Sequence, residues 1–521
     1  MNDRKDPLFA VWLTFSALTG LNVVIFGTFI IRASEMLKVQ YVPDDAFYYL
    51  QLAKNFSSLG QWTFDSGISV TSGFHLLLAY LLSGLYGLLQ PETTQFVNVG
   101  LGVSLLFTII TFIVLWRWAF SLKNVYFFLF LALILTSRNV VYNSVSGTEW
   151  SLVVLLAVLY GLFFFSRTDY RFRHFAALFL IGFLGSLARS DFGLFPFSLL
   201  AAVGLFQLLR RKLMPLAFPF IGLLGSVMGV LFTLLHNFIF TDQFLQSSAR
   251  MKAYWAGFQT SGYYVTLFHA VFLIGGVGLF ILLFLFLSAV LLKPNKRSGR
   301  SQEFKLTEKA TMMLVASSLS LVGYTIVYAH NSDVQPWYTA NLIMPLLFII
   351  AVLSDRFKHD SHHQYVIWGC SIVGIASILF STVSLYLLRS EHTPWPHQQI
   401  MLQVGQYLQQ QPLDGRVGAW NAGIIGYFQG GQVVNLDGLV NNDIYDYAIS
   451  NTLPSYLDEK RICYIVDFEN MLTDQAYRLR GGYDQPEWFS DSFEAIKVFD
   501  DGRFYWHHLT LYKVTSANCL P

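Results

Sequence analysis

Long apolar runs recur through the first three-quarters of the chain and limit its fold more than any other feature. The first run, 8–31, is about long enough for a helix to cross a hydrocarbon layer roughly 30 Å thick. No small-residue cleavage site follows it, so we expect a retained span rather than a signal peptide. Because a helix closes its own backbone hydrogen bonds, the runs predict a polytopic α-helical membrane protein. The further runs are 74–89, 97–116, 125–135, 151–165, 175–187, 192–209, 216–240, 264–292, 310–329, 340–353 and 365–388.

The composition agrees with a location among membrane lipids. Hydrophobic residues make up 54% of the chain and charged residues 13%, whereas soluble proteins carry about 25% charged residues. The formal net charge is only +2, and no basic, aromatic stripe suggests a nucleic-acid partner. The three cysteines, Cys370, Cys463 and Cys519, are too few and too scattered for a disulfide framework or a zinc site.

Clusters of lysine and arginine orient the spans, because cytoplasmic loops carry an excess of both. Placing these clusters inside puts the tail from residue 389 outside, together with the loops 32–73, 138–149, 241–263 and 330–338. A chain that begins inside and ends outside crosses an odd number of times. We therefore expect a multi-pass protein of the cell inner (plasma) membrane with about eleven spans, one fewer than the number of apolar runs.

The conflict in this count lies between residues 74 and 135. If Arg117 and Lys123 are inside, residues 74–118 supply only one net crossing, and one of the two runs there is re-entrant or lies along the membrane. The alternative is that both basic residues are outside and that another span is split.

The tail, 389–521, changes character and predicts a small soluble α/β domain outside the membrane. Residues 1–388 form the predicted membrane module. In the tail, short apolar stretches predict strands at 416–420, 433–436 and 462–467, and 443–458 predicts a helix. We expect a closing hairpin at 496–499 and 505–512, around the turn dipeptide Asp501-Gly502, and a linker at 409–412.

The first external loop, 32–73, carries the residues that most suggest chemistry. Asp44 and Asp45 precede an apolar stripe at helical spacing, made of Ala46, Tyr49, Leu50, Ala53 and Phe56. This pattern predicts a short amphipathic helix on the outer membrane surface that begins at Asp44. An aspartate there has a plain structural explanation, because an N-cap carboxylate satisfies free N–H groups of its own helix. The alternative is that the two acids are catalytic.

The wider pattern resembles the GT-C superfamily of membrane glycosyltransferases, specifically the bacterial branch related to protein mannosyltransferases and lipid A aminoarabinose transferases. Residues 44–47, Asn55, Gly60 and 71–75 follow the order of that family's first external loop. The phrase Ser146-Gly147-Thr148-Glu149 resembles its second external motif. Residues 417–423 and 435–438 resemble the C-terminal domain of some bacterial members.

This resemblance implies a GT-C fold and an inverting, lipid-linked sugar glycosyltransferase of the cell envelope. Such an enzyme moves a hexosyl or pentosyl group from a polyprenyl-phosphate donor to a hydroxyl of a glycan, lipid or protein acceptor on the outer face. Asp44 is then expected to take the acceptor's proton as general base, with Asp45 as the second catalytic acid. The leaving lipid phosphate needs cations or a metal to balance its charge.

Three basic residues are candidate phosphate ligands. Lys252 and Arg250 lie in an external loop, where Ser248 and Lys252 match a Ser-x-x-x-Lys phrase of related sequences. An ordinary interfacial lysine explains the position equally well. Arg189 interrupts apolar sequence, where ionisable residues are costly and often functional. A mutual ion pair with Asp191 that closes a hairpin is the structural alternative.

Two histidines and one acid complete the expected substrate-binding set. His75 and His330 are both placed outside, although a structural or interfacial role is commoner for a lone histidine. Glu149 belongs to the second external motif. Asp44, Asp45 and Glu149 offer the oxygen ligands that divalent cations accept. The first two are adjacent rather than spaced as Asp-x-Asp, so we expect no metal and no other cofactor.

Two other function classes remain open on the sequence. A transporter or lipid flippase typically shows inverted repeats and helices broken by Gly or Pro near the midplane, and no clear repeat is present. A non-catalytic, glycan-binding membrane scaffold would fit the size of the tail, but it would not need an acid-bearing amphipathic loop.

Overall fold

The computed structural model describes most of the chain. The described residues are 20–21, 23–122, 124–135, 137–166, 171–210, 216–257, 308–329, 335–356, 393–411, 413–484, 486–500, 502, 508–515 and 519. The expected spans 264–292 and 365–388, most of the run 8–31, and His330 lie outside them.

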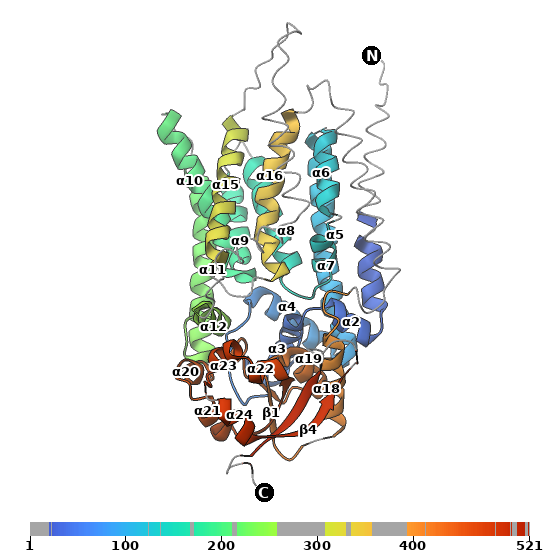
Figure 1. The fold of residues 1–521 in the computed structure, drawn as a ribbon. Coiled ribbons are helices and arrows are strands. Elements are labelled where there is room, and N and C mark those ends of the chain that lie inside the picture. The colour runs from blue at the N-terminus through green and yellow to red at the C-terminus, as the bar shows by residue number, and fades with distance from the viewer. Residues whose placement is uncertain are drawn as a thin grey trace.

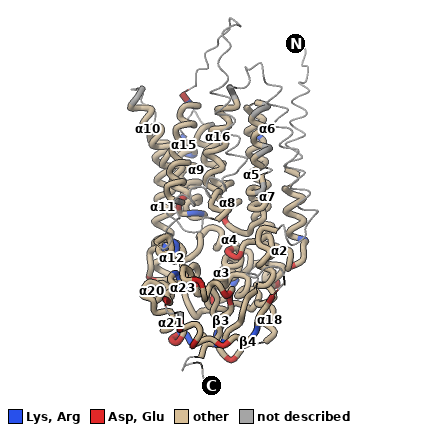
Figure 2. Tube along the Cα trace, in the orientation of Figure 1, with Lys and Arg blue, Asp and Glu red and all other residues tan. Residues whose placement is uncertain are grey.

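Apolar helices form a bundle at one end of the molecule, and an α/β domain lies at the other end (Figure 1). Charged residues gather around the α/β domain, whereas the bundle is mostly uncharged (Figure 2). Five described helical segments are long and apolar enough to cross a membrane: Thr93–Leu122, Ser190–Leu208, Ala217–Thr241, Glu308–Tyr328 and Pro336–Ser354. The chain is therefore a multi-pass α-helical membrane protein with a small C-terminal sheet domain.

Helices of the bundle expose apolar side chains that suit a lipid surface. On α11 (Ala217–Thr241), Leu235 is 54% exposed and Ile239 is 66% exposed. The other elements of the bundle are α5 (Thr93–Leu122), α6 (Val125–Leu135), α7 (Arg138–Asn143), α8 (Trp150–Ser166), α9 (Phe172–Ala188), η1 (Ser190–Gly193), α10 (Leu194–Arg210), α15 (Glu308–Ala329), η3 (Pro336–Thr339) and α16 (Ala340–Arg356).

The helices α4 (Leu76–Leu89) and α5 differ in a way that bears on the crossing count. Helix α5 is continuous over 30 residues, whereas α4 has only 14, fewer than the roughly 20 that a span needs. Helix α4 packs against α3 (Asp44–Leu59), near the end of the bundle that faces the α/β domain (Figure 1). This agrees with one run lying along the membrane. The total of eleven stays a prediction, because two expected spans lie outside the described residues.

Helix α3 follows α2 (Glu35–Tyr41) and begins at Asp44, as predicted. Its apolar stripe is buried apart from the half-buried Phe56, and Phe47 and Gln51 on other sides of the helix are buried too. Helix α19 (Ala422–Gln429) of the C-terminal domain covers that side, and the Phe47 ring lies 5.6 Å from the Tyr427 ring. A second layer therefore covers α3, and its position on the outer membrane surface stays a prediction.

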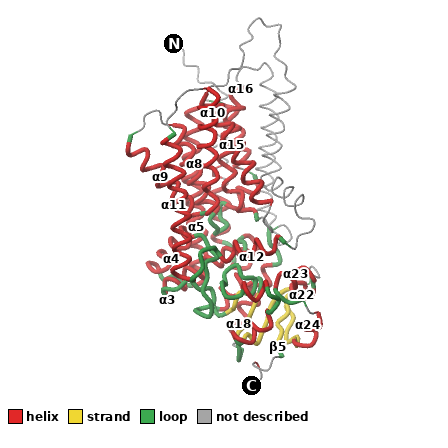
Figure 3. The backbone as a smooth tube through the Cα atoms, turned by 90° about the vertical axis from the view of Figure 1, so that its left-hand side faces the viewer, coloured by secondary structure: helices red, strands yellow, loops and turns green. Residues whose placement is uncertain are grey.

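The C-terminal domain is built on a five-stranded sheet with strand order β2-β1-β3-β5-β4. Figure 3 shows the strands in yellow, at the end of the molecule away from the helical bundle. Strands β1 (Arg416–Ala419), β2 (Val433–Asn435) and β3 (Ile462–Phe468) are parallel, and they occupy the three predicted stretches. Strands β4 (Phe493–Phe499) and β5 (Leu509–Val514) form the predicted antiparallel hairpin. Gly502 in its turn has a φ of 69°.

The helices around the sheet depart from the sequence prediction in two places. The helix expected at 443–458 is interrupted after residue 449, where Asn451 adopts a positive φ of 55°. The expected linker at 409–412 begins inside a helix that runs to Gln410. The helices of the domain are α18 (Gln398–Gln410), α19, α20 (Tyr445–Ile449), α21 (Leu453–Lys460), α22 (Glu469–Thr473), α23 (Gln475–Gly481) and α24 (Pro486–Ser492).

A disulfide joins Cys463 of β3 to Cys519, with the two Cα atoms 5.3 Å apart. A separation of 56 residues hides this pairing in the sequence.

The C-terminal domain and the segment 32–73 approach each other backbone to backbone. A Cβ atom added to Gly73 would lie 1.6 Å from the carbonyl oxygen of Leu439, so only glycine fits there. The backbone N–H of Ser72 donates to Asn442 at 2.9 Å, and the N–H of Asn442 donates to Val70 at 3.0 Å. These contacts fix the position of the domain on the loop that carries Asp44 and Asp45.

Candidate active site

A cavity of about 340 Å³ lies where the C-terminal domain meets the segment 32–73 and the helix α12 (Ser247–Ala256). Its wall comes from both parts of the chain. The lining residues are Pro43, Asp44, Asp45, Tyr48, Lys252, Trp255, Gln335, Trp337, Trp395, His397, Gln398, Trp420, Asn421, Asp437, Leu439, Met471, Tyr477, Arg480 and Gly481.

Asp44 lines the cavity, and its carboxylate also holds the C-terminal domain. The backbone N–H of Ile424 donates to Oδ1 at 2.6 Å, and that of Gly423 donates to Oδ2 at 3.1 Å. These N–H groups belong to the first turn of α19, so Asp44 caps a helix of the other domain. Burial raises the pKa of Asp44 to about 7, although the hydrogen bond from Ile424 opposes the rise and the charge of Asp45 adds to it.

The explanation of Asp44 as the N-cap of its own helix is wrong. The N-cap of α3 is Pro43, whose side chain makes no capping hydrogen bond. Asp44 is the first helical residue, and its carboxylate satisfies the amides of α19 instead.

Asp45 and Lys252 bring opposite charges to the same cavity. Among the described residues, none engages the Asp45 carboxylate in a hydrogen bond or an ion pair. Burial raises the pKa of Asp45, and the charge of Lys252 partly offsets the rise. The Lys252 ammonium donates to the Tyr338 hydroxyl and lies 4.9 Å from the centroid of that ring. Burial disfavours the charged ammonium, but Tyr338 and Asp45 outweigh it and raise the pKa of Lys252.

A smaller cavity of about 60 Å³ extends the site toward the bundle, and it shares Asp45, Tyr48 and Lys252 with the larger one. His75 and Glu149 line this second cavity. His75 Nε2 lies 3.7 Å from Glu149 Oε1. The structure thus gathers four predicted site residues, Asp45, Lys252, His75 and Glu149, around one small cavity, while Asp44 lines the larger one.

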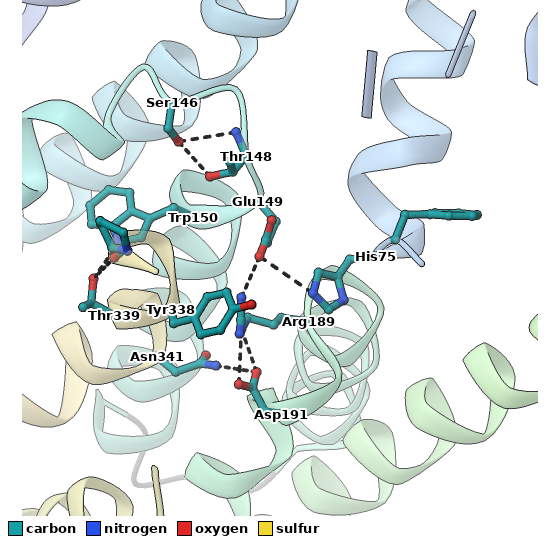
Figure 4. A network of polar contacts seen from close by, with 12 residues as sticks. His75, Ser146, Thr148, Glu149, Trp150, Arg189, Asp191, Tyr338, Thr339 and Asn341 are labelled. Atoms are coloured by element: carbon teal, nitrogen blue, oxygen red, sulfur yellow. Dashed lines mark hydrogen bonds and ion pairs between the residues drawn. The ribbon is translucent and has the colours of Figure 1, made fainter. Parts of the chain in front are cut away.

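Arg189 is not among the residues that line either cavity. Figure 4 shows its guanidinium between Glu149 and Asp191. Its guanidinium donates to Glu149 Oε1 at 2.6 Å and to Asp191 Oδ1 at 3.0 Å, and it lies 4.3 Å from the Tyr338 ring centroid. Asn341 donates to the same Asp191 oxygen at 2.8 Å. The pair with Asp191 matches the structural alternative for Arg189. The pair with Glu149 connects Arg189 to the cavity through another residue.

Arg250 points elsewhere on α12. Its guanidinium lies 3.8 Å from the Tyr445 ring centroid and 3.8 Å from Asp446, and it also bonds to Gln243. It is not among the residues that line either cavity.

Sequence reasoning missed the residues that the C-terminal domain contributes. Asp437 follows β2 and accepts the N–H of Leu439 at 2.7 Å, and the Tyr48 hydroxyl donates to it at 3.5 Å. Burial raises the pKa of Asp437 to about 8. Trp420 and Asn421 follow β1. The carboxyl ends of parallel strands share one edge of a sheet, where ligands commonly bind, and this rule is the signal that would have identified them.

A buried acid of β3 shapes the same edge. Asp467 accepts the backbone N–H groups of Trp420 and Asn421 at 2.7 and 2.9 Å, and the Asn421 side chain at 2.7 Å. The Asp467 carboxylate therefore fixes the loop that carries Trp420 and Asn421 into the cavity.

Within the described residues, no group of three or more His, Cys, Asp or Glu side chains is arranged to hold a metal ion. Two of the three acids considered as metal ligands have other partners. Asp44 accepts two amides, and Glu149 accepts Arg189 and the Tyr49 hydroxyl.

The site therefore combines acids whose pKa lies near neutrality, Asp44 and Asp437, with a charged lysine, at the boundary between apolar helices and the C-terminal α/β domain. A carboxylate with a pKa near the working pH is suited to take a proton. A buried ammonium is suited to stabilise an anion that forms beside it.

Two comparisons by sequence frame these observations. A family described as a domain of unknown function (DUF8728) matches residues 391–514. No curated protein matches the chain significantly.

Comparison with solved structures gives matches over nearly the whole chain. ArnT from Cupriavidus metallidurans, bound to undecaprenyl phosphate, is 12% identical, with a TM-score of 0.53 over 98% of this chain and 99% of that chain. The archaeal oligosaccharyltransferase AglB from Archaeoglobus fulgidus, in complex with an inhibitory peptide and a dolichol-phosphate, is 11% identical, with a TM-score of 0.46 over 98% of this chain and 75% of that chain. The similarity to ArnT shows that this chain has the GT-C fold, as its sequence predicts.

Proposed function

We propose that this protein is a membrane glycosyltransferase that transfers a sugar from a polyprenyl-phosphate donor to a hydroxyl group on the outer face of the inner membrane. The observation that carries the proposal is the meeting of Asp44, Asp45 and Lys252 in one cavity between the apolar bundle and the soluble domain. The solved structure of ArnT, which shares the fold, is bound to undecaprenyl phosphate. A lipid donor accounts for a site at this boundary, because its chain stays in the membrane while its phosphate reaches the cavity.

The reaction balances with a single base. The acceptor oxygen forms a bond to the anomeric carbon as its proton passes to a carboxylate, for which Asp44 is the proposed base. The bond between the anomeric carbon and the phosphate oxygen breaks, and the lipid phosphate leaves with the electron pair. Attack from the face opposite the leaving group inverts the anomeric configuration.

The geometry favours Asp44 in this role because two amides hold its carboxylate still. A base that cannot turn away needs no reorganisation when the reaction occurs. Asp45 lies at the junction of the two cavities and faces the charge of Lys252, so its proposed role is to orient that ammonium and the sugar.

Lys252 is the proposed partner of the departing phosphate. Its ammonium borders both cavities, and Tyr338 and Asp45 keep it protonated. His75 and Glu149 border the smaller cavity on the bundle side, where a lipid phosphate would enter. Arg189 acts behind them by holding Glu149. We propose no metal, because the ammonium supplies positive charge and two of the three candidate ligand acids, Asp44 and Glu149, already have partners.

The proposed orientation places the C-terminal domain outside the cytoplasm. The disulfide between Cys463 and Cys519 supports it, because disulfides persist in oxidising compartments such as the bacterial periplasm.

The direct test uses purified protein in detergent with radiolabelled polyprenyl-phosphate sugars and membrane extract as the acceptor source. Release of polyprenyl phosphate that depends on both protein and extract is the expected result. Protein carrying Lys252→Ala and Asp44→Asn together serves as the matched control. Equal release by wild type and control, or none with any donor, would contradict the proposal.

A further inference from the structure

Aromatic rings are frequent among the residues that line the larger cavity. Four of the chain's 12 tryptophans line this cavity: Trp255, Trp337, Trp395 and Trp420. Tyr477 of α23 adds a fifth ring. The rings come from different elements, because Trp255 belongs to α12, Trp337 to η3 and Trp420 to the loop after β1.

Polar groups lie among these rings. Asn421 donates its amide nitrogen to Asp467, and its Oδ1 accepts no hydrogen bond from any described residue, so the oxygen remains to accept a hydroxyl. Asp437 and Gln398 also line the cavity. The Arg480 guanidinium lies 4.3 Å from the Trp255 ring centroid, so this planar group of N–H donors belongs to the wall of the cavity.

Two indoles of this wall carry unused donors. Nε1 of Trp255 and Nε1 of Trp420 are buried without a hydrogen-bond partner among the described residues. Unpaired buried donors are costly. A hydroxyl-rich ligand in the cavity would bring acceptors beside them.

We propose that this wall binds a saccharide, so that the acceptor is a sugar hydroxyl of a glycan. The proposal rests on the glycosyltransferase function above and adds the acceptor class. A sugar ring has an apolar C–H face that packs on an aromatic plane and a rim of hydroxyls that bond to acids, amides and guanidinium groups. The cavity has that combination, and its volume of about 340 Å³ falls in the usual range of small-ligand sites, about 300–1,000 Å³.

A peptide acceptor fits the same wall less well. Extended peptides are commonly held by main-chain hydrogen bonds to a strand edge. The described residues that line the cavity lie in loops and helices, and none of them belongs to a strand. The site therefore offers rings and side-chain polar groups rather than a strand edge.

The test measures ligand binding to the full-length protein in detergent by saturation-transfer NMR. The probes are methyl glycosides and disaccharides of common hexoses, deoxyhexoses and N-acetylhexosamines, and blocked Ser/Thr peptides. Trp395→Ala and Tyr477→Ala remove rings that are only half-buried, so the domain should still fold. The matched controls are Trp488→Ala and Tyr407→Ala, which remove half-buried rings of the same domain that do not line the cavity.

We expect at least one glycoside to bind, and both cavity variants to raise its Kd by about tenfold. Both controls should change the Kd by less than about twofold. Failure of every glycoside to bind, or equal binding by wild type and both cavity variants, would overturn the proposal. Peptide binding that only the cavity variants lose would overturn it in favour of a peptide acceptor.

Undecaprenyl phosphate, measured in the same way, separates this proposal from the proposed function. If it binds while no glycoside does, only the acceptor class is wrong. If neither binds, the glycosyltransferase function fails as well.

Discussion

Asp44→Asn is expected to abolish transfer while leaving the protein folded, and the reason can be worked from the side chain's surroundings. The carboxylate accepts the N–H groups of Gly423 and Ile424 in α19. Asn keeps one acceptor oxygen and places its amide nitrogen against the other N–H. One buried N–H then loses its partner, which costs about 1–3 kcal/mol.

The same substitution removes a cost that wild type carries. A pKa raised to about 7 corresponds to roughly 4 kcal/mol against the ionised side chain in the folded protein. Because the folded pKa is above the unfolded value, this group's contribution to stability is complete at acid pH and is lost as the pH rises through about 7. The variant has no such loss. Above pH 7 its melting temperature should equal or exceed that of wild type.

The activity of Asp44→Asn should fall, although its melting temperature does not. Only the ionised carboxylate accepts a proton, so wild-type turnover should rise with pH through about 7. Loss of a general base typically costs about 10²–10⁴-fold in rate, and no pH should restore the variant. The assay is initial-rate transfer from a radiolabelled polyprenyl-phosphate sugar, beside thermal unfolding of the same samples from pH 5 to pH 9.

Asp45→Asn is the matched control, because the neighbouring carboxylate has no hydrogen bond to α19 and faces Lys252. We expect it to lower turnover less than Asp44→Asn does. Normal transfer by Asp44→Asn would refute the general-base assignment. The reverse order of severity would give that role to Asp45. A melting temperature that falls in step with activity at pH 8 would mean that Asp44 acts only by holding the C-terminal domain.

Four further outcomes are expected. Lys252→Ala should raise the donor KM and lower kcat, with a smaller effect from Arg250→Ala, in steady-state assays at limiting donor; normal turnover there would exclude the phosphate contact. Transfer should persist in EDTA, and restoration of a lost activity by Mg²⁺ or Mn²⁺ would show a metal requirement. Cys463→Ser should lower the melting temperature, since the disulfide with Cys519 stabilises by about 2–4 kcal/mol, and reductant should then have no further effect. A C-terminal alkaline phosphatase fusion should be active in cells; activity of a cytoplasmic reporter at that position would reverse the orientation.

The sequence predicted the local structure of the segment 32–73, but it did not predict that the C-terminal domain packs over this segment. Helix α3 begins at Asp44 and buries its apolar stripe because both properties follow from nearby residues. The partner of Asp44 lies about 380 positions away, and nothing in the loop indicates it. The sequence therefore correctly suggested that Asp44 caps a helix, but the capped helix is α19 rather than α3.

In the tail, the prediction was good where structure follows from short apolar stretches and poor where it follows from topology. Strands β1, β2 and β3 appear where their residues indicate. The expected helix is interrupted at Asn451, which adopts a left-handed backbone conformation. The pattern of apolar residues does not reveal such a change at one position. Asp437 and Trp420 lie in the same cavity because they follow the carboxyl ends of two parallel strands, β1 and β2. The positions of the strands in the sequence do not reveal that these strands are parallel neighbours.

The C-terminal domain and the segment that carries Asp44 fit tightly together, and both contribute to the site. A Cβ added to Gly423 would lie 2.4 Å from the Asp44 carbonyl oxygen, and one added to Gly73 would strike Leu439, so the two surfaces leave no room for a side chain between them. The proposed base is fixed by amides of the C-terminal domain, and the aromatic wall belongs largely to that domain. The acid pair of the first loop therefore forms a complete site only when the domain is docked on it. A chain truncated before α18 would keep Asp44, Asp45 and the apolar bundle, but it would lack the cap that holds the base and two rings of the proposed acceptor wall, Trp420 and Tyr477.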